Sequence, residues 1–256
     1  MKKLLLLITG LLLLFSVEGQ ILRYSNYTAP PEEPAGGNGL LTNLVAYWTL
    51  DETSGTYADS HGSNDATDHG DLWGSGNNGK IGNAPTFTAG TTDYISITEV
   101  ADLQMYQSDV SVSFWVYVNS IPTDGNHRAF IGSEDTGFEI EQIGYNNGYV
   151  RVRATATAPD GPTIGTGAWH HVVVTYSDAS ATDNIVYYLD GSATTVSGDI
   201  NVASGKGTIY IGANNAWDNA KTSLDGLMDE VAIWKGRVLD SDDVAALYNE
   251  IGRAHV

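Results

Sequence analysis

Apolar and polar residues alternate along several short segments of the chain, and the clearest run covers residues 110–118. The residues of one parity in this run are all apolar, namely Val110, Val112, Phe114, Val116 and Val118. Successive side chains of a β-strand point to opposite faces of its sheet. The alternation therefore predicts a strand with one face in a hydrophobic core.

Other runs of β-branched and aromatic residues, separated by Gly, Asn and Asp, predict further strands. These segments are residues 44–50, 93–98, 129–132, 138–143, 149–157, 169–176, 185–190, 209–212 and 227–234. The dipeptides Asn147-Gly148 and Asp190-Gly191 predict tight hairpins, because both tolerate the positive φ of such turns. Many short strands without alternating helices predict an all-β, antiparallel two-sheet sandwich.

One segment near the carboxyl end, residues 238–248, has a helical period instead. Val244 and Leu247 lie on one face of such a helix. Asp240 or Ser241 can cap its amino end, since both side chains accept hydrogen bonds from free backbone amides. We expect one short helix that packs on the sandwich.

The start of the chain has no strand pattern. Lys2 and Lys3, an apolar stretch and small residues before Gln20 have the order of a secretory signal peptide. The apolar stretch is about a dozen residues long, whereas a membrane span needs about twenty, so we expect cleavage and a secreted or cell-surface protein. Prolines and glycines then predict a linker. The expected parts are a signal peptide, a linker, one folded domain and a tail, over residues 1–19, 20–39, 40–252 and 253–256.

Composition excludes several classes of function. The chain has 31 acidic and 12 basic residues and a formal charge of −19, which repels phosphate backbones and argues against nucleic-acid binding. It has no cysteine, so disulfides and a lipid-modified cysteine are excluded. No serine lies in a Gly-x-Ser-x-Gly setting, which argues against acyl-transfer enzymes. After the amino-terminal stretch, no apolar run is long enough for membrane insertion.

Several short motifs occur in the order found in one family. They lie at residues 45–55, 79–84, 113–116, 169–176, 188–191 and 223–234, and the last reads Ser-Leu-Asp-Gly-Leu-Met-Asp-Glu-Val-Ala-Ile-Trp. Together they resemble the laminin-G-like, concanavalin A-like lectin and glucanase jelly rolls. The resemblance implies two curved antiparallel sheets, a first strand near the last, and a concave face and loop rim open to ligands.

Glu139 and Glu141 are two residues apart on a predicted strand and so share one face. Glucanases with the jelly roll that this chain resembles use paired carboxylates on one strand. Their pattern continues to a further carboxylate, whereas Gln142, Ile143 and Gly144 stand here. We therefore interpret the pair as a polar strand face and expect no enzyme, with an endo-glycosidase as the alternative.

The histidines show no metal-binding pattern. His170 and His171 are adjacent on a predicted strand, so their rings point to opposite faces and cannot hold one ion. His171 shares a face with Trp169 and Val173, which predicts a packed or hydrogen-bonded side chain. The others are expected in loops or the tail without zinc-like spacing, namely His61, His69, His127 and His255.

If the first and last strands are neighbours, as the resemblance implies, acids from both can converge on calcium. The candidate ligands are Asp51, Glu52, Asp59, Asp229 and Glu230. By strand parity Asp229 lies on one face with Leu227, Val231 and Ile233, so an ionised carboxylate there needs a partner. That partner is a cation, a pair of backbone amides or Arg237. A structural calcium and a hydrogen-bonded buried acid are the two alternatives.

Two predicted loops combine tryptophan with glycine and asparagine. Sugars stack their C–H faces on aromatic rings and pair their hydroxyls with planar polar groups. These loops supply the candidate ligand-binding residues Trp73, Asn77, Asn78, Asn214, Asn215, Trp217 and Asp218. The alternative is that the tryptophans pack on their own domain.

The chain is thus predicted to be a secreted, non-catalytic binding module that recognises a glycan or an extracellular protein surface through its rim loops. A second hypothesis is an endo-glycosidase that uses Glu139 and Glu141. A third is a structural or adhesive component of a surface, a matrix or a virion.

Overall fold

The computed structural model describes residues 16–17, 20–21, 39–74, 78–98, 103, 108–123, 126–133, 139–143, 148–153, 159–178, 184–198, 207–214 and 222–250. The chain divides into two units, residues 1–35 and 36–256. In the first unit, β1 (Ser16–Val17) and β2 (Gln20–Ile21) form a small antiparallel pair. The signal peptide and its cleavage stay a prediction.

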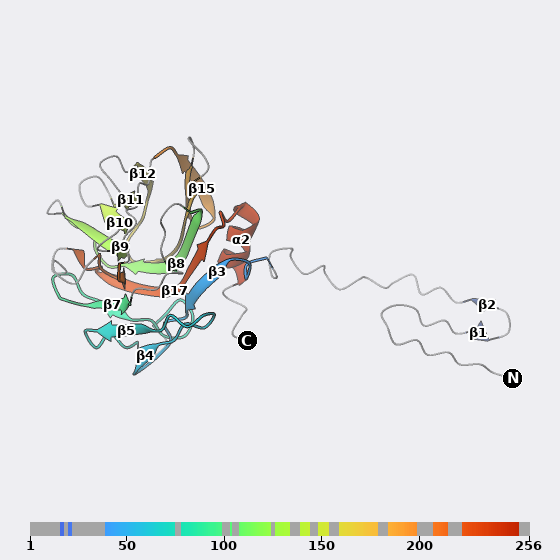
Figure 1. Ribbon diagram of the computed structural model, residues 1–256, viewed down its shortest axis with the longest axis horizontal. Coiled ribbons are helices and arrows are strands. Elements are labelled where there is room, and N and C mark those ends of the chain that lie inside the picture. Colours follow the sequence, from blue (N-terminus) through green and yellow to red (C-terminus); the bar gives the residue numbers. More distant parts are fainter. Residues whose placement is uncertain are drawn as a thin grey trace. The chain divides into compact units, whose positions relative to one another are not determined.

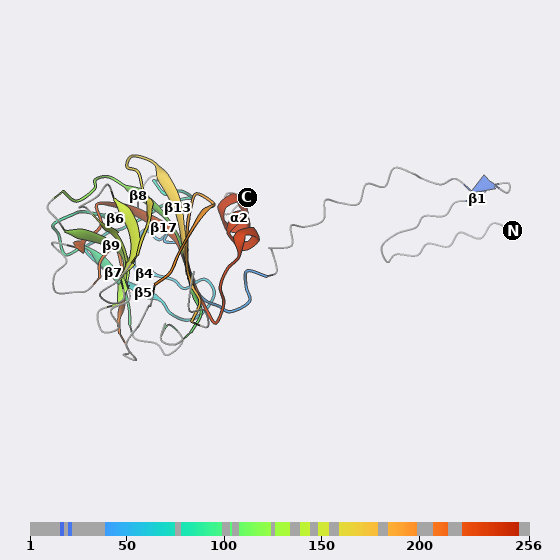
Figure 2. The same ribbon diagram turned by 90° about the horizontal axis from the view of Figure 1, so that it is seen from above.

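The second unit contains two antiparallel sheets (Figures 1 and 2). The eight-stranded sheet runs in the order β12 (Asp160–Thr163), β11 (Tyr149–Arg153), β10 (Glu139–Ile143), β9 (His127–Ser133), β16 (Ile209–Ile211), β7 (Tyr94–Ile97), β5 (Ala66–His69) and β4 (Thr56–Tyr57). The seven-stranded sheet runs in the order β15 (Ser192–Val196), β14 (Ile185–Leu189), β13 (Trp169–Tyr176), β8 (Val110–Val118), β17 (Gly226–Lys235) and β3 (Leu44–Trp48), and β6 (Thr86–Phe87) also pairs with β17. The all-β sandwich predicted from the sequence is confirmed.

The hydrophobic core lies between the two sheets. All five apolar residues of one parity in β8 belong to it, as the alternation predicts. From the opposite sheet come Ile131, Ile140 and Val152, which are cross-strand neighbours on β9, β10 and β11. The rings of Phe114 and Phe130 lie 5.4 Å apart across the core. Burial of this apolar surface is the main stabilising contribution to the sandwich, since the chain has no disulfide.

Helix α2 (Ser241–Glu250) packs on the outer face of the seven-stranded sheet. Val244 and Leu247 join Val173 and Trp234 of that sheet in a second apolar cluster. In both views the helix lies on the side of β8 and β17 away from β7 and β9 (Figures 1 and 2). We call the sheet surface under α2 the helix-covered face. Among the described residues, no helix is long and apolar enough to cross a membrane.

The helix begins three residues later than its sequence pattern suggests. Asp240 Oδ1 accepts hydrogen bonds from the amides of Asp242 and Asp243, both at 2.9 Å. Asp240 is therefore the amino-terminal cap, one of the two residues proposed for that role. The segment before it is held to the sheet, because the Ser111 hydroxyl donates to Arg237 O and accepts from Leu239 N.

Strand β17 contains a β-bulge that corrects one prediction. Its register to β8 shifts between Asp229 and Ala232, and Glu230 has a φ of 54°. Asp229 pairs with Trp115 on the helix-covered side, whereas Val231 beyond the bulge lies in the core. The expectation that these two side chains share a face is wrong, because the extra residue of a bulge reverses strand parity. The expected pairing of first and last long strands, β3 with β17, is present.

Candidate functional site

The outer face of the eight-stranded sheet carries charged side chains in register. Glu139 on β10 lies opposite Arg153 on β11, and Glu141 lies opposite Arg151. On the other side of β10, Glu139 pairs with Gly132 of β9. Because alternate residues of a strand share a face, both acids and both arginines lie on the surface away from the core. The prediction that Glu139 and Glu141 share a face is confirmed.

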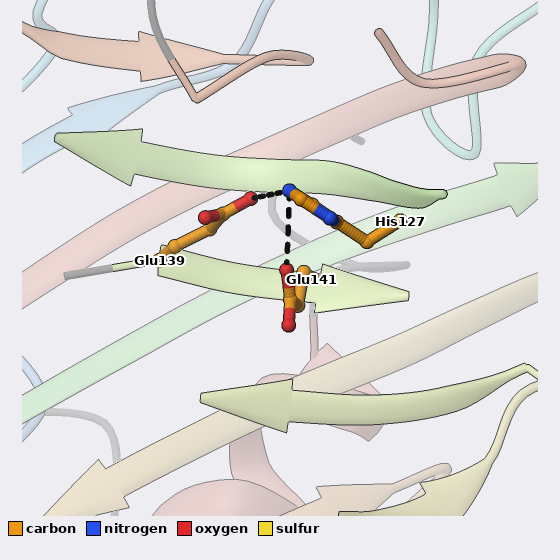
Figure 3. Close-up of side chains that lie close together, drawn as sticks. All are labelled: His127, Glu139 and Glu141. Carbon is orange, nitrogen blue, oxygen red and sulfur yellow. Dashed lines mark ion pairs between the residues drawn. The ribbon is translucent and has the colours of Figure 1, made fainter. Parts of the chain in front are cut away.

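His127, Glu139 and Glu141 form what we call the His-Glu-Glu cluster (Figure 3). His127 Nε2 lies 3.2 Å from Glu139 Oε1 and 3.4 Å from Glu141 Oε2. One ring nitrogen therefore faces an oxygen of each acid. His127 is the first residue of β9 and His69 is the last residue of β5, so the expectation that these two histidines lie in loops is wrong. Cross-strand packing, which spacing along the chain does not reveal, brings His127 to the acids.

Two arginines contact the carboxylate oxygens of the acids that do not face His127. Arg151 donates from Nε to Glu141 Oε1 at 2.7 Å, and its Nη2 contacts the same oxygen. Arg153 Nη1 lies 3.5 Å from Glu139 Oε2 and 3.4 Å from His127 Nε2. Sequence reasoning missed both arginines, although a signal exists. The Asn147-Gly148 turn predicts that residues 149–153 fold back antiparallel on residues 139–143, which places opposite charges across the hairpin.

The segment at Asn214 crosses this face beside the cluster. A Cβ at Gly132 would lie 2.6 Å from Asn214 Cα, so the close approach requires glycine. Asn214 Nδ2 donates to Glu139 Oε2 at 3.4 Å, and Thr222 Oγ1 donates to Asn214 Oδ1 at 2.8 Å. One predicted rim residue thus lies against Glu139.

Burial changes the acidity of the cluster. The Glu141 side chain is 0% exposed, Glu139 is 6% exposed and His127 is 25% exposed. Burial raises the pKa of the Glu141 carboxyl, and the charge of Glu139 raises it further, against the opposing effects of His127 and Arg151. Burial lowers the pKa of the His127 imidazole, but contacts with Glu139 and Glu141 outweigh this effect, so its pKa is raised.

Aromatic side chains extend the same face towards β5. Tyr210 of β16 pairs with Gly132 on one side and with Ser96 of β7 on the other. The ring of Tyr94 lies 5.5 Å from that of Tyr210 and stacks at 4.3 Å on His69 of β5. Tyr94, His69 and Arg151 are partly exposed. A row of planar polar groups therefore runs across six strands of the sheet.

The described residues of the first tryptophan loop have structural contacts. Trp73 stacks on Tyr57 with ring centroids 4.8 Å apart and packs against the core. Asn78 exchanges two 3.1 Å hydrogen bonds with the backbone of Ala84. Trp73 therefore packs on its own domain, which is the alternative to ligand binding given for the tryptophans. Four other predicted ligand residues lie outside the described residues, namely Asn77, Asn215, Trp217 and Asp218.

The acids predicted for calcium separate into different hydrogen-bonded arrangements. Asp59 accepts backbone amides on both oxygens, from Tyr47, His61, Gly62 and Asn64. Burial raises the pKa of Asp59, but these hydrogen bonds outweigh it and lower the pKa overall. Glu52 Oε1 accepts from Ala58 N at 2.8 Å.

The remaining candidates are Asp51, Asp229 and Glu230. Their hydrogen bonds connect the end of β3, strand β17 and residues 81–83. Asp51 Oδ1 accepts from Asn83 N at 2.7 Å, and Asp229 Oδ2 accepts from Ile81 N at 3.0 Å. Glu230 Oε2 accepts from the Tyr47 hydroxyl. Burial raises the pKa of Asp229 to about 8, with the charges of Glu230 and Asp51 adding to it.

Backbone amides are therefore the partner of Asp229, one of the three alternatives predicted for it. Arg237 does not fill that role, since its Nη2 lies 2.7 Å from both carboxylate oxygens of Asp243. In the described part of the chain, no calcium candidate belongs to a group of three close acidic or histidine ligands. Calcium binding stays a prediction.

His171 is a packed, hydrogen-bonded side chain, as the sequence predicts. It is fully buried on the helix-covered face, where Nε2 lies 2.9 Å from Ser113 Oγ. Its ring centroid is 5.0 Å from that of Trp115. Burial lowers the pKa of His171 to about 4, so the ring is neutral at physiological pH.

A family profile described as the concanavalin A-like lectin/glucanases superfamily matches residues 89–245. The chain belongs to this superfamily. The match begins before β7 and ends within α2, so it includes every residue of the His-Glu-Glu cluster. A comparison with curated protein sequences finds no match.

Solved structures share the fold of this concanavalin A-like domain. Domain 4 of AbnA, an extracellular GH43 arabinanase of Geobacillus stearothermophilus in complex with arabinotriose, has a TM-score of 0.61 and 22% identity, with 81% of this chain and 98% of that chain covered. The sialidase of Trypanosoma rangeli in complex with sialic acid has a TM-score of 0.59 and 17% identity, with 83% of this chain covered. This chain spans 33% of the sialidase. At such identities the likeness shows the fold alone.

Proposed function

We propose that the protein is a secreted, non-catalytic module that binds a glycan on the outer face of its eight-stranded sheet. The observation that carries this proposal is the row of planar polar and aromatic side chains across that face. Arg151, His127, Tyr94 and His69 are all partly exposed there. Guanidinium and imidazole groups pair with sugar hydroxyls, and tyrosine rings stack on sugar C–H faces.

The fold supports this choice. The AbnA domain, whose match covers 81% of this chain, was solved in complex with arabinotriose. Asn214, a predicted ligand residue, contacts Glu139 on this face from the segment that follows β16.

The contacts of the two acids support the non-catalytic part of this proposal. A glycosidase needs one carboxyl as proton donor and another as nucleophile or base, both reaching the sugar. Here Glu141 is fully buried and bonded by Arg151, and Glu139 is held by Asn214. An endo-glycosidase remains the enzymatic alternative, since the two acids do share one face.

The test begins with a glycan array, followed by calorimetric titration of the best oligosaccharide against wild type and variants. Tyr94→Ala should weaken binding about fivefold, which corresponds to the ~1 kcal/mol of one aromatic stacking contact. Tyr117→Ala is the matched control, because Tyr117 is also partly exposed but lies in the other sheet. Equal binding by wild type and Tyr94→Ala would show that the glycan does not bind on this face.

Two further measurements separate the alternatives. If Trp217→Ala abolishes binding while Tyr94→Ala does not, the rim loop alone is the site. If wild type releases reducing sugar from a polysaccharide and Glu141→Gln does not, the protein is a glycosidase. A stable oligomer that binds no array glycan would favour the structural or adhesive role.

A further inference from the structure

We infer that His127, Glu139 and Glu141 form a binding site for a divalent transition metal ion of the zinc type. This inference is independent of glycan binding. The metal would bind between one imidazole nitrogen and one oxygen of each carboxylate, the three atoms that face one another in Figure 3.

The distances between these atoms fit such an ion. A tetrahedral metal with ligand bonds of about 2.0–2.1 Å separates its ligands by about 3.3 Å. His127 Nε2 lies 3.2 Å from Glu139 Oε1 and 3.4 Å from Glu141 Oε2. Two edges of the tetrahedron are thus present without any movement of the side chains.

The arrangement of the two acids around one ring nitrogen favours a bound cation. Glu139 Oε1 and Glu141 Oε2 are buried, and among the described residues both face the same partner, His127 Nε2. The imidazole Nε2 carries at most one hydrogen, so it can satisfy only one of the two oxygens that face it. A buried carboxylate oxygen without a partner is costly, and a metal ion at this point would be bound by both.

The other oxygen of each acid is already engaged, which fixes its orientation. Arg151 holds Glu141 Oε1, and Asn214 holds Glu139 Oε2 while Thr222 holds Asn214. Metal sites use such outer contacts to aim their ligands. Arg153 lies 3.4 Å from His127 Nε2 and must move when the metal binds, which its 48% exposed side chain allows.

The ligand set selects the kind of metal. Calcium and magnesium prefer six or more oxygen ligands, whereas imidazole with carboxylates suits zinc and its neighbours in the first transition row. Three protein ligands leave a fourth position for water or a bound molecule. His127 is 25% exposed, so that position can be reached from solvent.

The experiment uses the full chain after treatment with a chelator. Zinc titrated by calorimetry should bind with a 1:1 stoichiometry, and His127→Gln should raise the Kd by about 100-fold or more. His69→Gln is the matched control, since His69 lies on the same sheet face but contacts Ser96 instead of acids. Glu141→Gln and Glu52→Gln form a second pair, in which only the first should lose zinc.

A spectroscopic measurement avoids dependence on the folding of variants. Cobalt bound to wild type in a four-coordinate site should give intense visible absorption that zinc displaces. Absence of stoichiometric binding by wild type, or His127→Gln binding as tightly as His69→Gln, would overturn the inference. The cluster would then be an ion-pair network of the two acids, His127 and the arginines.

Discussion

The outer faces of the two sheets bury different kinds of polar side chain. On the helix-covered face, Ser111 and Ser113 lie buried and each hydroxyl has a partner in the protein. On the outer face of the eight-stranded sheet, Glu139 and Glu141 are also buried, and one oxygen of each faces the same partner, His127 Nε2. Hydroxyls that are bonded under a helix contribute to the fold, whereas two buried acids that share one histidine nitrogen require a cation or a proton to explain them.

This comparison predicts the largest effect on the helix-covered face. Trp234→Ala should destabilise the domain by about 3–5 kcal/mol, because Trp234 is 1% exposed and packs against Leu239 and Val244. Urea denaturation followed by fluorescence or circular dichroism measures the change. A loss under ~1 kcal/mol would mean that α2 contributes little to the fold.

The second prediction concerns Asp229 at the β17 bulge. Its pKa is raised from an unfolded value of about 4 to about 8, so the folded state holds a proton that the unfolded state releases. The contribution of Asp229 to stability is therefore present below about pH 4 and is lost as pH rises towards 8. Asp229→Asn mimics the protonated form and should stabilise the protein at pH 8 by about 2–5 kcal/mol.

Calcium makes the opposite prediction for the same residue. If Asp229 binds calcium, it is ionised, and Asp229→Asn should weaken the site and lower stability in the presence of the ion. Calcium at about a hundred times its Kd would raise the stability of wild type by about 2.7 kcal/mol. Melting curves at pH 6 and pH 8, with calcium or with a chelator, distinguish the two states of Asp229.

How far the sequence predicts this fold depends on how apolar each strand is. The boundaries of β8 and β13 match the predicted segments, because their core positions are valine, phenylalanine and tyrosine. By contrast, β15 reads Ser-Ala-Thr-Thr-Val and is largely exposed, so no apolar alternation marks it. Strand β12 contains Pro162, which is tolerated because this strand lies at the edge of its sheet.

The candidate site was less predictable because it depends on register. The sequence indicates that Glu139 and Glu141 share a face, and the hairpin turn can place Arg151 and Arg153 opposite them. The position of His127 depends on a register shift between β9 and β10 that no local pattern marks. A bulge likewise reversed the expected face of Asp229. Such irregularities arise from long-range packing rather than from local propensity.

A smaller effect is expected where α2 begins. Asp240→Ala removes the side chain that accepts the amides of Asp242 and Asp243, and should cost about 1 kcal/mol. Asp242→Ala is the control, since Asp242 is exposed in the first turn and its charge contributes only a few tenths of a kcal/mol. An equal loss of stability in both variants would show that interaction with the helix dipole, and not capping, stabilises the amino end of α2.

The smallest expected change in stability lies on the outer face of the eight-stranded sheet. Arg153→Ala should alter the free energy of unfolding by about 0.5 kcal/mol or less, since the arginine is 48% exposed and its ion pair with Glu139 spans 3.5 Å. The same variant should raise the pKa of His127, because the positive charge of Arg153 lowers it. Proton NMR titration of the imidazole measures this, with Lys235→Ala in the other sheet as control. An unchanged titration combined with a large loss of stability would mean that Arg153 holds the sheet together, and the contrast between the two faces would disappear.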